Sequence, residues 1–312
     1  MKITLDISKL VEEGKLTREE ADKLTALAAH DTGSLGINIL IGFGVIAIAA
    51  GAVALVPTPL TAVSLGLALF AAGFAIVLNR VQQWILLGQI CLVIGALMFG
   101  GGVIAYGAGS LASMLIVTGA FALAAIAARS SLLMALAVLA ASACLGARTG
   151  YSDALYSLAI FEPTLTIVLF SALALIAYQA SQRLPADYER LAITAARTSL
   201  LLINFGFWIG SLWGDPLMLL RSMNAKDASL DIIPAAVFSI LWAVVLLGAG
   251  IWAVQVNRRW LVNLVALFAG IHFYTQWFER LGATPLSVLL GGVVMLASAF
   301  ALWMFNRRVP DA

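Results

Sequence analysis

From Gly36 onward, long apolar runs alternate with short polar gaps. The runs hold about 17–23 residues, which is the length that a helix needs to cross about 30 Å of hydrocarbon. Lipid offers the backbone no hydrogen-bond partners, so runs this continuous are expected to be helices. The predicted fold class is an all-α polytopic integral membrane helix bundle over residues 36–306. Its ten predicted spans lie at about 36–56, 60–78, 84–106, 111–128, 131–147, 163–180, 196–213, 232–254, 260–278 and 285–305.

The first 35 residues follow a different pattern, with frequent charges and only short apolar stretches. They predict a cytoplasmic helical hairpin in which Gly14 ends the first helix. Thr17 and Glu20 form a capping box for the second helix. This hairpin has too little apolar surface to fold alone. It is expected to dock on the bundle, on a second copy of the chain or on a cytoplasmic protein.

Composition agrees with a membrane bundle, since 62% of the residues are hydrophobic and only 11% are charged. Soluble domains carry about 25% charged residues. No basic patch is interleaved with aromatic residues, so nucleic acid is not an expected partner. Cys91 and Cys144 lie inside apolar runs, which supports neither a disulfide framework nor a metal site. No catalytic or cofactor-binding motif is found, so we expect neither a cofactor nor an enzyme.

The lysines and arginines are distributed unequally between the two sides of the predicted bundle. Positive residues favour the cytoplasmic side, so this bias predicts that both termini are cytoplasmic. The short tail 307–312 lies on that side, as does a predicted interfacial helix at 181–195. The longest outer loops are predicted at about 148–162 and 214–231. Fourteen positive residues lie on one side, Lys2, Lys9, Lys15, Arg18, Lys23, Arg80, Arg129, Arg183, Arg190, Arg197, Arg258, Arg259, Arg307 and Arg308, and four on the other, Arg148, Arg221, Lys226 and Arg280.

The most polar stretch at membrane depth belongs to the ninth predicted span. His272, Thr275, Gln276 and Glu279 share one helical stripe, and polar groups inside a membrane often mark a pathway. In the functional interpretation, Glu279 and Arg280 form an outer mouth and His272 lies deeper. In the structural interpretation, the outer residues lie among the headgroups, and His272 bonds a neighbouring carbonyl.

Two further polar side chains and a run of glycines could contribute to the same site. Gln89 lies early in the third predicted span, and Asn204 lies in the middle of the seventh. Each could join His272 or hold two helices together. Gly100, Gly101 and Gly102 could break a helix, as in transporter binding sites, or permit close helix contact.

A possible internal repeat relates spans 1–4 to spans 7–10. The sequence runs from Asn79-Arg80 to Gly107-Ala108-Gly109-Ser110-Leu111, and again from Asn257-Arg258 to Gly282-Ala283-Thr284-Pro285-Leu286. Both units would start on the cytoplasmic side, as in a parallel repeat. The repeat predicts a site between the third and ninth spans.

Both ends of the chain resemble one family. The opening Leu10-Val11-Glu12-Glu13-Gly14-Lys15-Leu16-Thr17-Arg18-Glu19-Glu20-Ala21, followed by glycine-rich spans, resembles the prokaryotic membrane proteins called domain of unknown function 2157. The close of the chain, from Tyr274 to Asn306-Arg307-Arg308, is similar to the end of such proteins. The resemblance implies a bacterial inner-membrane location. It supplies no established activity and no site residues.

Two functions are compatible with these patterns. The first is a transporter-like protein for a small solute or ion, and it predicts a wet cavity lined by His272 with Gln89 or Asn204. The alternative is a membrane scaffold or sensor that recruits a cytoplasmic partner through residues 1–31. In that case the polar residues of the spans would form dry helix contacts.

Overall fold

Helices dominate the computed structural model, which describes residues 11, 14–15, 17–79, 82–152, 155–217 and 233–308. Within these ranges, eight helices are long and apolar enough to cross a membrane. This confirms the prediction of a helical, multi-pass membrane protein. The chain forms two compact units, Met1–Leu133 and Met134–Ala312.

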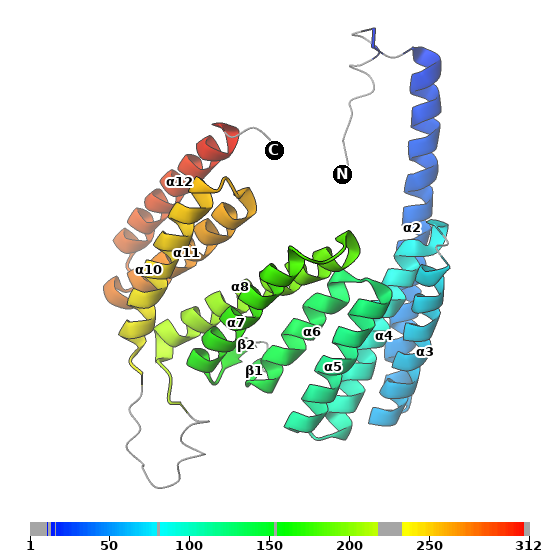
Figure 1. Ribbon diagram of the computed structural model, residues 1–312, viewed down its shortest axis with the longest axis horizontal. Coiled ribbons are helices and arrows are strands. Elements are labelled where there is room, and N and C mark those ends of the chain that lie inside the picture. Colours follow the sequence, from blue (N-terminus) through cyan, green and yellow to red (C-terminus); the bar gives the residue numbers. More distant parts are fainter. Residues whose placement is uncertain are drawn as a thin grey trace. The chain divides into compact units, whose positions relative to one another are not determined.

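The first unit contains the helices α2 to α5 (Figure 1). α2 is by far the longest, and it extends past the ends of α3 and α4 in the same unit. The predicted second hairpin helix and the predicted first span are one unbroken helix. The predicted first hairpin helix lies mostly outside the described residues. The elements of the unit are α2 (Arg18–Leu55), α3 (Pro59–Leu78), the 3-10 turn η1 (Gln82–Trp84), α4 (Ile85–Tyr106) and α5 (Leu111–Ala128).

The predicted capping box begins α2. Thr17 Oγ1 accepts a hydrogen bond from the Glu20 backbone N–H at 3.3 Å, and Glu20 Oε2 accepts one from the Thr17 N–H at 3.0 Å. Two amides that the helix itself leaves unbonded are thereby satisfied. Gly14, three residues earlier, has a φ of +68°, which suits a residue that ends a preceding helix.

Glycines at seven-residue intervals pack α3 directly against α4. A Cβ placed on Gly95 would lie 2.5 Å from the backbone N of Phe70, and one on Gly66 would lie 2.5 Å from the backbone N of Phe99. Gly73 meets the backbone at Gly88 in the same way. Two helix backbones come this close only where side chains are absent. The resulting glycine seam consists of Gly66, Gly73, Gly88, Gly95 and Gly102.

The triple glycine does not break a helix, which corrects one of the two predictions for it. α4 continues from Ile85 to Tyr106 without interruption. Gly102 packs against the backbone at Val63 of α3, and Gly100 packs against Phe121 of α5. Gly101 faces open space. The prediction of close helix contact is therefore the correct one for the outer two glycines.

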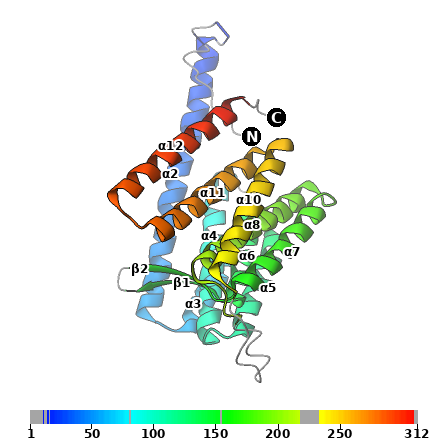
Figure 2. The same ribbon diagram turned by 90° about the vertical axis from the view of Figure 1, so that its left-hand side faces the viewer.

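The second unit contains a β-hairpin and a series of helices. Figures 1 and 2 both show α11 between α10 and α12. The predicted interfacial helix at 181–195 and the predicted seventh span form one helix, α8. The elements are α6 (Ser131–Cys144), which starts at the unit boundary, β1 (Ala147–Ser152), β2 (Leu155–Ile160), α7 (Pro163–Ser181), α8 (Ala186–Trp213), α10 (Ala235–Gln255), α11 (Arg259–Leu281) and α12 (Pro285–Arg308).

The β-hairpin occupies the place of the predicted outer loop at 148–162. β1 and β2 pair antiparallel, with Ala147 opposite Ile160 and Ser152 opposite Leu155. No strand was predicted in this chain. The other predicted outer loop, at 214–231, is closed at its base by paired backbone hydrogen bonds between Asp215 and Ile233. Residues 218–232 lie outside the described ranges.

Aromatic side chains from α7, α8, α10 and α11 form the core of the second unit. Trp242 of α10 lies at its centre and is fully buried, at 0% exposure. Phe268 of α11 packs beside it, with ring centroids 6.5 Å apart, and makes an edge-to-face contact with Phe205 of α8. This core therefore places α11 next to both α8 and α10.

Candidate functional site

His272 of α11 lies against the core of the second unit. Its imidazole meets the fully buried ring of Trp242 edge to face, with centroids 4.9 Å apart and an interplanar angle of 75°. This arrangement places the partly positive edge of one ring against the face of the other. The contact therefore holds His272, the polar residue of α11 that was predicted to lie deepest in the membrane, against α10.

Two tryptophans tie the helices around His272 together by hydrogen bonds. Trp242 Nε1 donates to Asn204 Oδ1 of α8 at 2.9 Å, and Trp208 Nε1 of α8 donates to Thr275 Oγ1 of α11 at 3.0 Å. Asn204 Nδ2 in turn donates to the Leu200 carbonyl at 2.8 Å. Both ends of the Asn204 amide are therefore bonded to protein. We call Asn204, Trp208, Trp242, His272 and Thr275 the tryptophan network.

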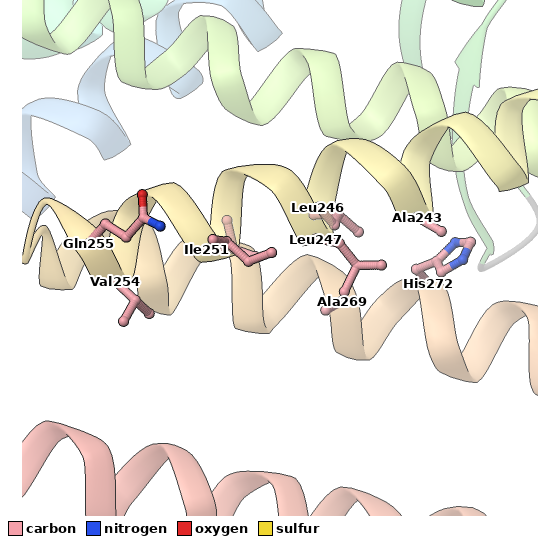
Figure 3. Close-up of a pocket in the computed structure, with 10 residues that line it drawn as sticks. Ala243, Leu246, Leu247, Ile251, Val254, Gln255, Ala269 and His272 are labelled. Atoms are coloured by element: carbon pink, nitrogen blue, oxygen red, sulfur yellow. The ribbon is translucent and has the colours of Figure 1, made fainter.

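The imidazole of His272 is only half-buried, and it also lines a groove (Figure 3). The groove has a volume of about 640 Å³ and lies between α10 and α11. Figure 3 shows His272 at one end of it and Gln255 at the other. The Nδ1 atom of His272 is buried and has no hydrogen-bond partner among the described residues. The groove is lined by Ala243, Leu246, Leu247, Gly250, Ile251, Val254, Gln255, Val265, Ala269 and His272.

The other predicted site residues on α11 whose side chains are described, Gln276 and Glu279, do not line the groove at His272. Gln276 is half-buried on α11, and Glu279 is exposed near the end of that helix. Arg280 belongs to the last turn of α11, and its side chain lies outside the description. Gln89 is exposed on α4 of the first unit. The structure thus joins His272 to one other predicted residue, Asn204, through Trp242.

The aromatic residues that follow His272 pack against one another along α11 and connect this helix to α12. Tyr274 stacks on Phe278 with centroids 5.5 Å apart, and Phe273 meets Trp277 at 5.0 Å. Trp277 Nε1 donates to the Ser287 carbonyl at the start of α12, at 3.1 Å. This cluster lies near the end of α11, and its hydrogen bond to Ser287 fixes the turn between α11 and α12.

The turns that suggested an internal repeat differ in backbone conformation. After α4, the residues with positive φ are Ala108 and Gly109, whereas after α11 it is Gly282. Asn257 has a φ of +56° but Asn79 has a φ of −77°. The two similar stretches of sequence therefore form turns of different backbone conformation, and these turns do not support an internal repeat.

Asp215 is a buried carboxylate whose role the sequence did not reveal. It has 0% exposure and lies two residues after the end of α8. Its Oδ2 accepts from the Thr164 N–H at the start of α7, and its Oδ1 accepts from the Leu217 N–H, both at 2.8 Å. The N-terminus of a helix attracts negative charge, so Asp215 stabilises α7 from a distant part of the chain. The loop position of Asp215 was predicted, but no local pattern connects it to Thr164.

Within the described residues, no group of three or more His, Cys, Asp or Glu side chains is arranged to hold a metal ion. The site is instead a set of aromatic rings, amide and hydroxyl groups around one histidine. No protein-family model, curated protein or solved structure matches the chain. The class therefore rests on the helices themselves, which define a multi-pass helical membrane protein.

Proposed function

We propose that the protein is a membrane scaffold or sensor that recruits a cytoplasmic protein through its N-terminal segment. The observation that carries this proposal is the continuity of α2. The helix runs from the Thr17 cap through the first apolar span to Leu55 without a break. A partner bound near its start is therefore joined rigidly to the membrane.

The length of α2 supports this role. The apolar part Ile37–Leu55 has 19 of the 38 residues of the helix. At 1.5 Å per residue it rises about 28 Å, close to the thickness of the hydrocarbon core. The other half, residues 18–36, extends the same rod by about 28 Å. A tilt or rotation of the span is thus transmitted to the docking segment.

The surroundings of His272 favour this function over transport. A transport pathway requires polar groups that water or a solute can reach. Asn204 is instead bonded to Trp242 and to the Leu200 carbonyl, and the groove at His272 is apolar. Asn204 and Thr275 therefore hold helices together through their bonds to Trp242 and Trp208.

The proposed topology has ten spans, with both termini in the cytoplasm of a bacterial inner membrane. It adds the two shorter apolar helices, α6 and Pro285–Ala301 of α12, to the eight long ones. An even number of spans agrees with the excess of lysine and arginine on one side. The resemblance to the family of unknown function supports the bacterial location.

A proline substitution in the extension of α2 tests the proposal. Proline removes a backbone hydrogen bond and kinks a helix, so Ala28→Pro should uncouple the N-terminal segment from the span. With a photo-cross-linking residue at Lys23 in whole cells, we expect the cross-linked product of the original chain to be lost. The matched variant Ala28→Ser should retain the product, and thermal unfolding of the purified variants should show intact spans.

Two results would contradict the proposal. The first is a function in vivo that survives removal of residues 1–31. The second is solute uptake by proteoliposomes that depends on His272, measured with His272→Leu. Either result would favour transport over the scaffold or sensor function.

A further inference from the structure

The groove between α10 and α11 is open at the surface of the second unit. Both helices are long and apolar enough to cross a membrane. Half of the residues along the groove are exposed, with 69% exposure for Leu247 and 61% for Ile251. Apolar surface of this kind at membrane depth is covered by hydrocarbon.

The length of the groove matches one leaflet. From Ala243 to Gln255 it follows α10 for twelve residues, which corresponds to about 18 Å. Half of the hydrocarbon core is about 15 Å thick. His272 closes one end near the middle of α11, where its ring packs on Trp242. A single acyl chain that enters at Gln255 would therefore end close to His272.

The opposite end of the groove is polar and basic. Gln255 lines the groove there, and Arg258 follows in the tight turn to α11; both side chains are exposed. Arg197 of α8 lies at the same end, with its guanidinium 4.8 Å from the centre of the Trp260 ring. Amide and guanidinium groups are donors, and a guanidinium binds phosphate strongly.

We propose that this groove binds one anionic phospholipid. One of its two acyl chains lies along α10 and α11, and its phosphate meets Arg258 and Gln255 at the membrane surface. The groove is apolar over about the length of one leaflet and has cationic residues at the end near Gln255. A phospholipid in that leaflet has the same arrangement, with apolar acyl chains and a charged phosphate at the membrane surface. The site belongs to the second unit and does not depend on the partner proposed for the N-terminal segment.

Lipid titration of the purified full-length protein tests the site. Native mass spectrometry would measure binding of phosphatidylglycerol and of phosphatidylcholine with identical chains. We expect about fivefold tighter binding of phosphatidylglycerol, because one arginine near an anionic lipid contributes about 1 kcal/mol. Arg258→Gln should abolish this preference. Arg183→Gln, in the exposed turn before α8, should retain it.

A matched pair of substitutions tests the acyl-chain part of the groove. Ile251 lines the groove, whereas Ile240 lies on the same helix outside it and is similarly exposed, at 65%. Ile251→Trp should fill the groove and weaken phosphatidylglycerol binding about tenfold, and Ile240→Trp should leave it unchanged. Leu247→Trp provides a second filling variant. All three positions are exposed, so the fold should survive, which thermal unfolding without added lipid would check.

Three outcomes would overturn the proposal. Equal binding of the two lipids by the original chain would exclude the cationic mouth. Equal effects of Ile251→Trp and Ile240→Trp would exclude the groove. A dimer that Ile251→Trp dissociates, with no dependence on lipid, would show that a second copy of the chain covers this face.

Discussion

The two units hold their helices together by opposite means. In the first, the glycine seam brings the backbones of α3 and α4 into direct contact. In the second, α8, α10 and α11 are held apart by large rings and joined through the tryptophan network. Lipid chains are as apolar as leucine, so apolar side chains alone give membrane helices little reason to associate. The two remaining solutions are close backbone packing and hydrogen bonding. The first unit relies mainly on close packing, with a hydrogen bond from the Asn38 amide of α2 to the Gln83 carbonyl at 2.8 Å, and the second joins α8, α10 and α11 by hydrogen bonds.

The two solutions have different consequences. A glycine seam tolerates no added atom, but it contains no polar group that must be satisfied. The tryptophan network tolerates small changes of shape, but each lost partner leaves a polar atom in an apolar core.

The largest effect is expected from adding atoms to the glycine seam. Gly95→Leu would force α3 and α4 apart, since even a Cβ at this position lies 2.5 Å from the Phe70 backbone. Overpacking should lower the free energy of unfolding by about 3 kcal/mol or more. Gly101→Leu is the matched control on the same helix, where nothing lies within 4 Å. Thermal and denaturant unfolding in detergent would compare them, and equal stabilities would rule out the seam.

A smaller effect is expected at Asp215. Asp215→Ala leaves the N–H groups of Thr164 and Leu217 without their acceptor. The expected loss of stability is about 2 kcal/mol, the cost of unsatisfied buried donors. Hydrogen exchange should show faster exchange of the Thr164 amide. In the control, Asp187→Ala, an exposed carboxylate is removed from the first turn of α8, and the loss should be below about 1 kcal/mol. Unchanged exchange at Thr164 would refute this assignment.

The tryptophan network should show a modest coupling between its members. In a double-mutant cycle, Trp242→Phe and Asn204→Ala should interact by about 1 kcal/mol, as membrane hydrogen bonds do. Trp252 of α10 is half-exposed and serves as the control, with no coupling expected between Trp252→Phe and Asn204→Ala. Equilibrium unfolding of the single and double variants would give both values. A coupling of zero in the first cycle would mean that packing alone holds these helices.

The smallest effect concerns the start of α2, outside both interfaces. Hydrogen bonds from the Thr17 backbone N–H, and then from its hydroxyl, hold the pKa of Glu20 below its usual value. The lowered pKa means that folding favours the carboxylate. The cap therefore contributes fully above the ordinary glutamate pKa near 4.5 and is lost as the pH falls through the lower folded value.

Hydrogen exchange at the first amides of α2 would follow this loss as the pH falls. Glu20→Gln should remove the acid-dependent change, whereas Glu19→Gln, at a neighbouring position of the same helix, should preserve it. An identical pH response in both variants would show that Glu20 does not cap α2.

The spans were predictable because their signal is local. Ten apolar runs correspond to described helices, and boundaries such as Pro59, Ser110 and Pro163 follow from cap and proline chemistry. The continuity of two helices, α2 and α8, was not predictable. Apolar runs mark where the membrane begins, but a helix can continue through polar residues, as α2 and α8 do. The β-hairpin at 147–160 has no alternating apolar pattern to reveal it.

The candidate site was predictable only in part. His272 and Asn204 were visible as polar residues inside apolar runs, and the structure connects them through Trp242. Trp242 itself carried no signal, because a tryptophan in an apolar run looks like any other lipid-facing or core residue. The glycine seam did have a signal in the sequence, namely glycines at seven-residue spacing in two neighbouring spans.

In the ten-span topology proposed above, the short helix α6 has a consequence for the surrounding bilayer. Its 14 residues rise about 21 Å, roughly 9 Å less than the hydrocarbon core of an ordinary bilayer. A helix that crosses the membrane with this deficit causes hydrophobic mismatch, and the adjacent lipids must thin to meet its ends. Membranes with shorter acyl chains should therefore accommodate the protein best, so that bilayer thickness becomes a variable that sets its conformation and distribution.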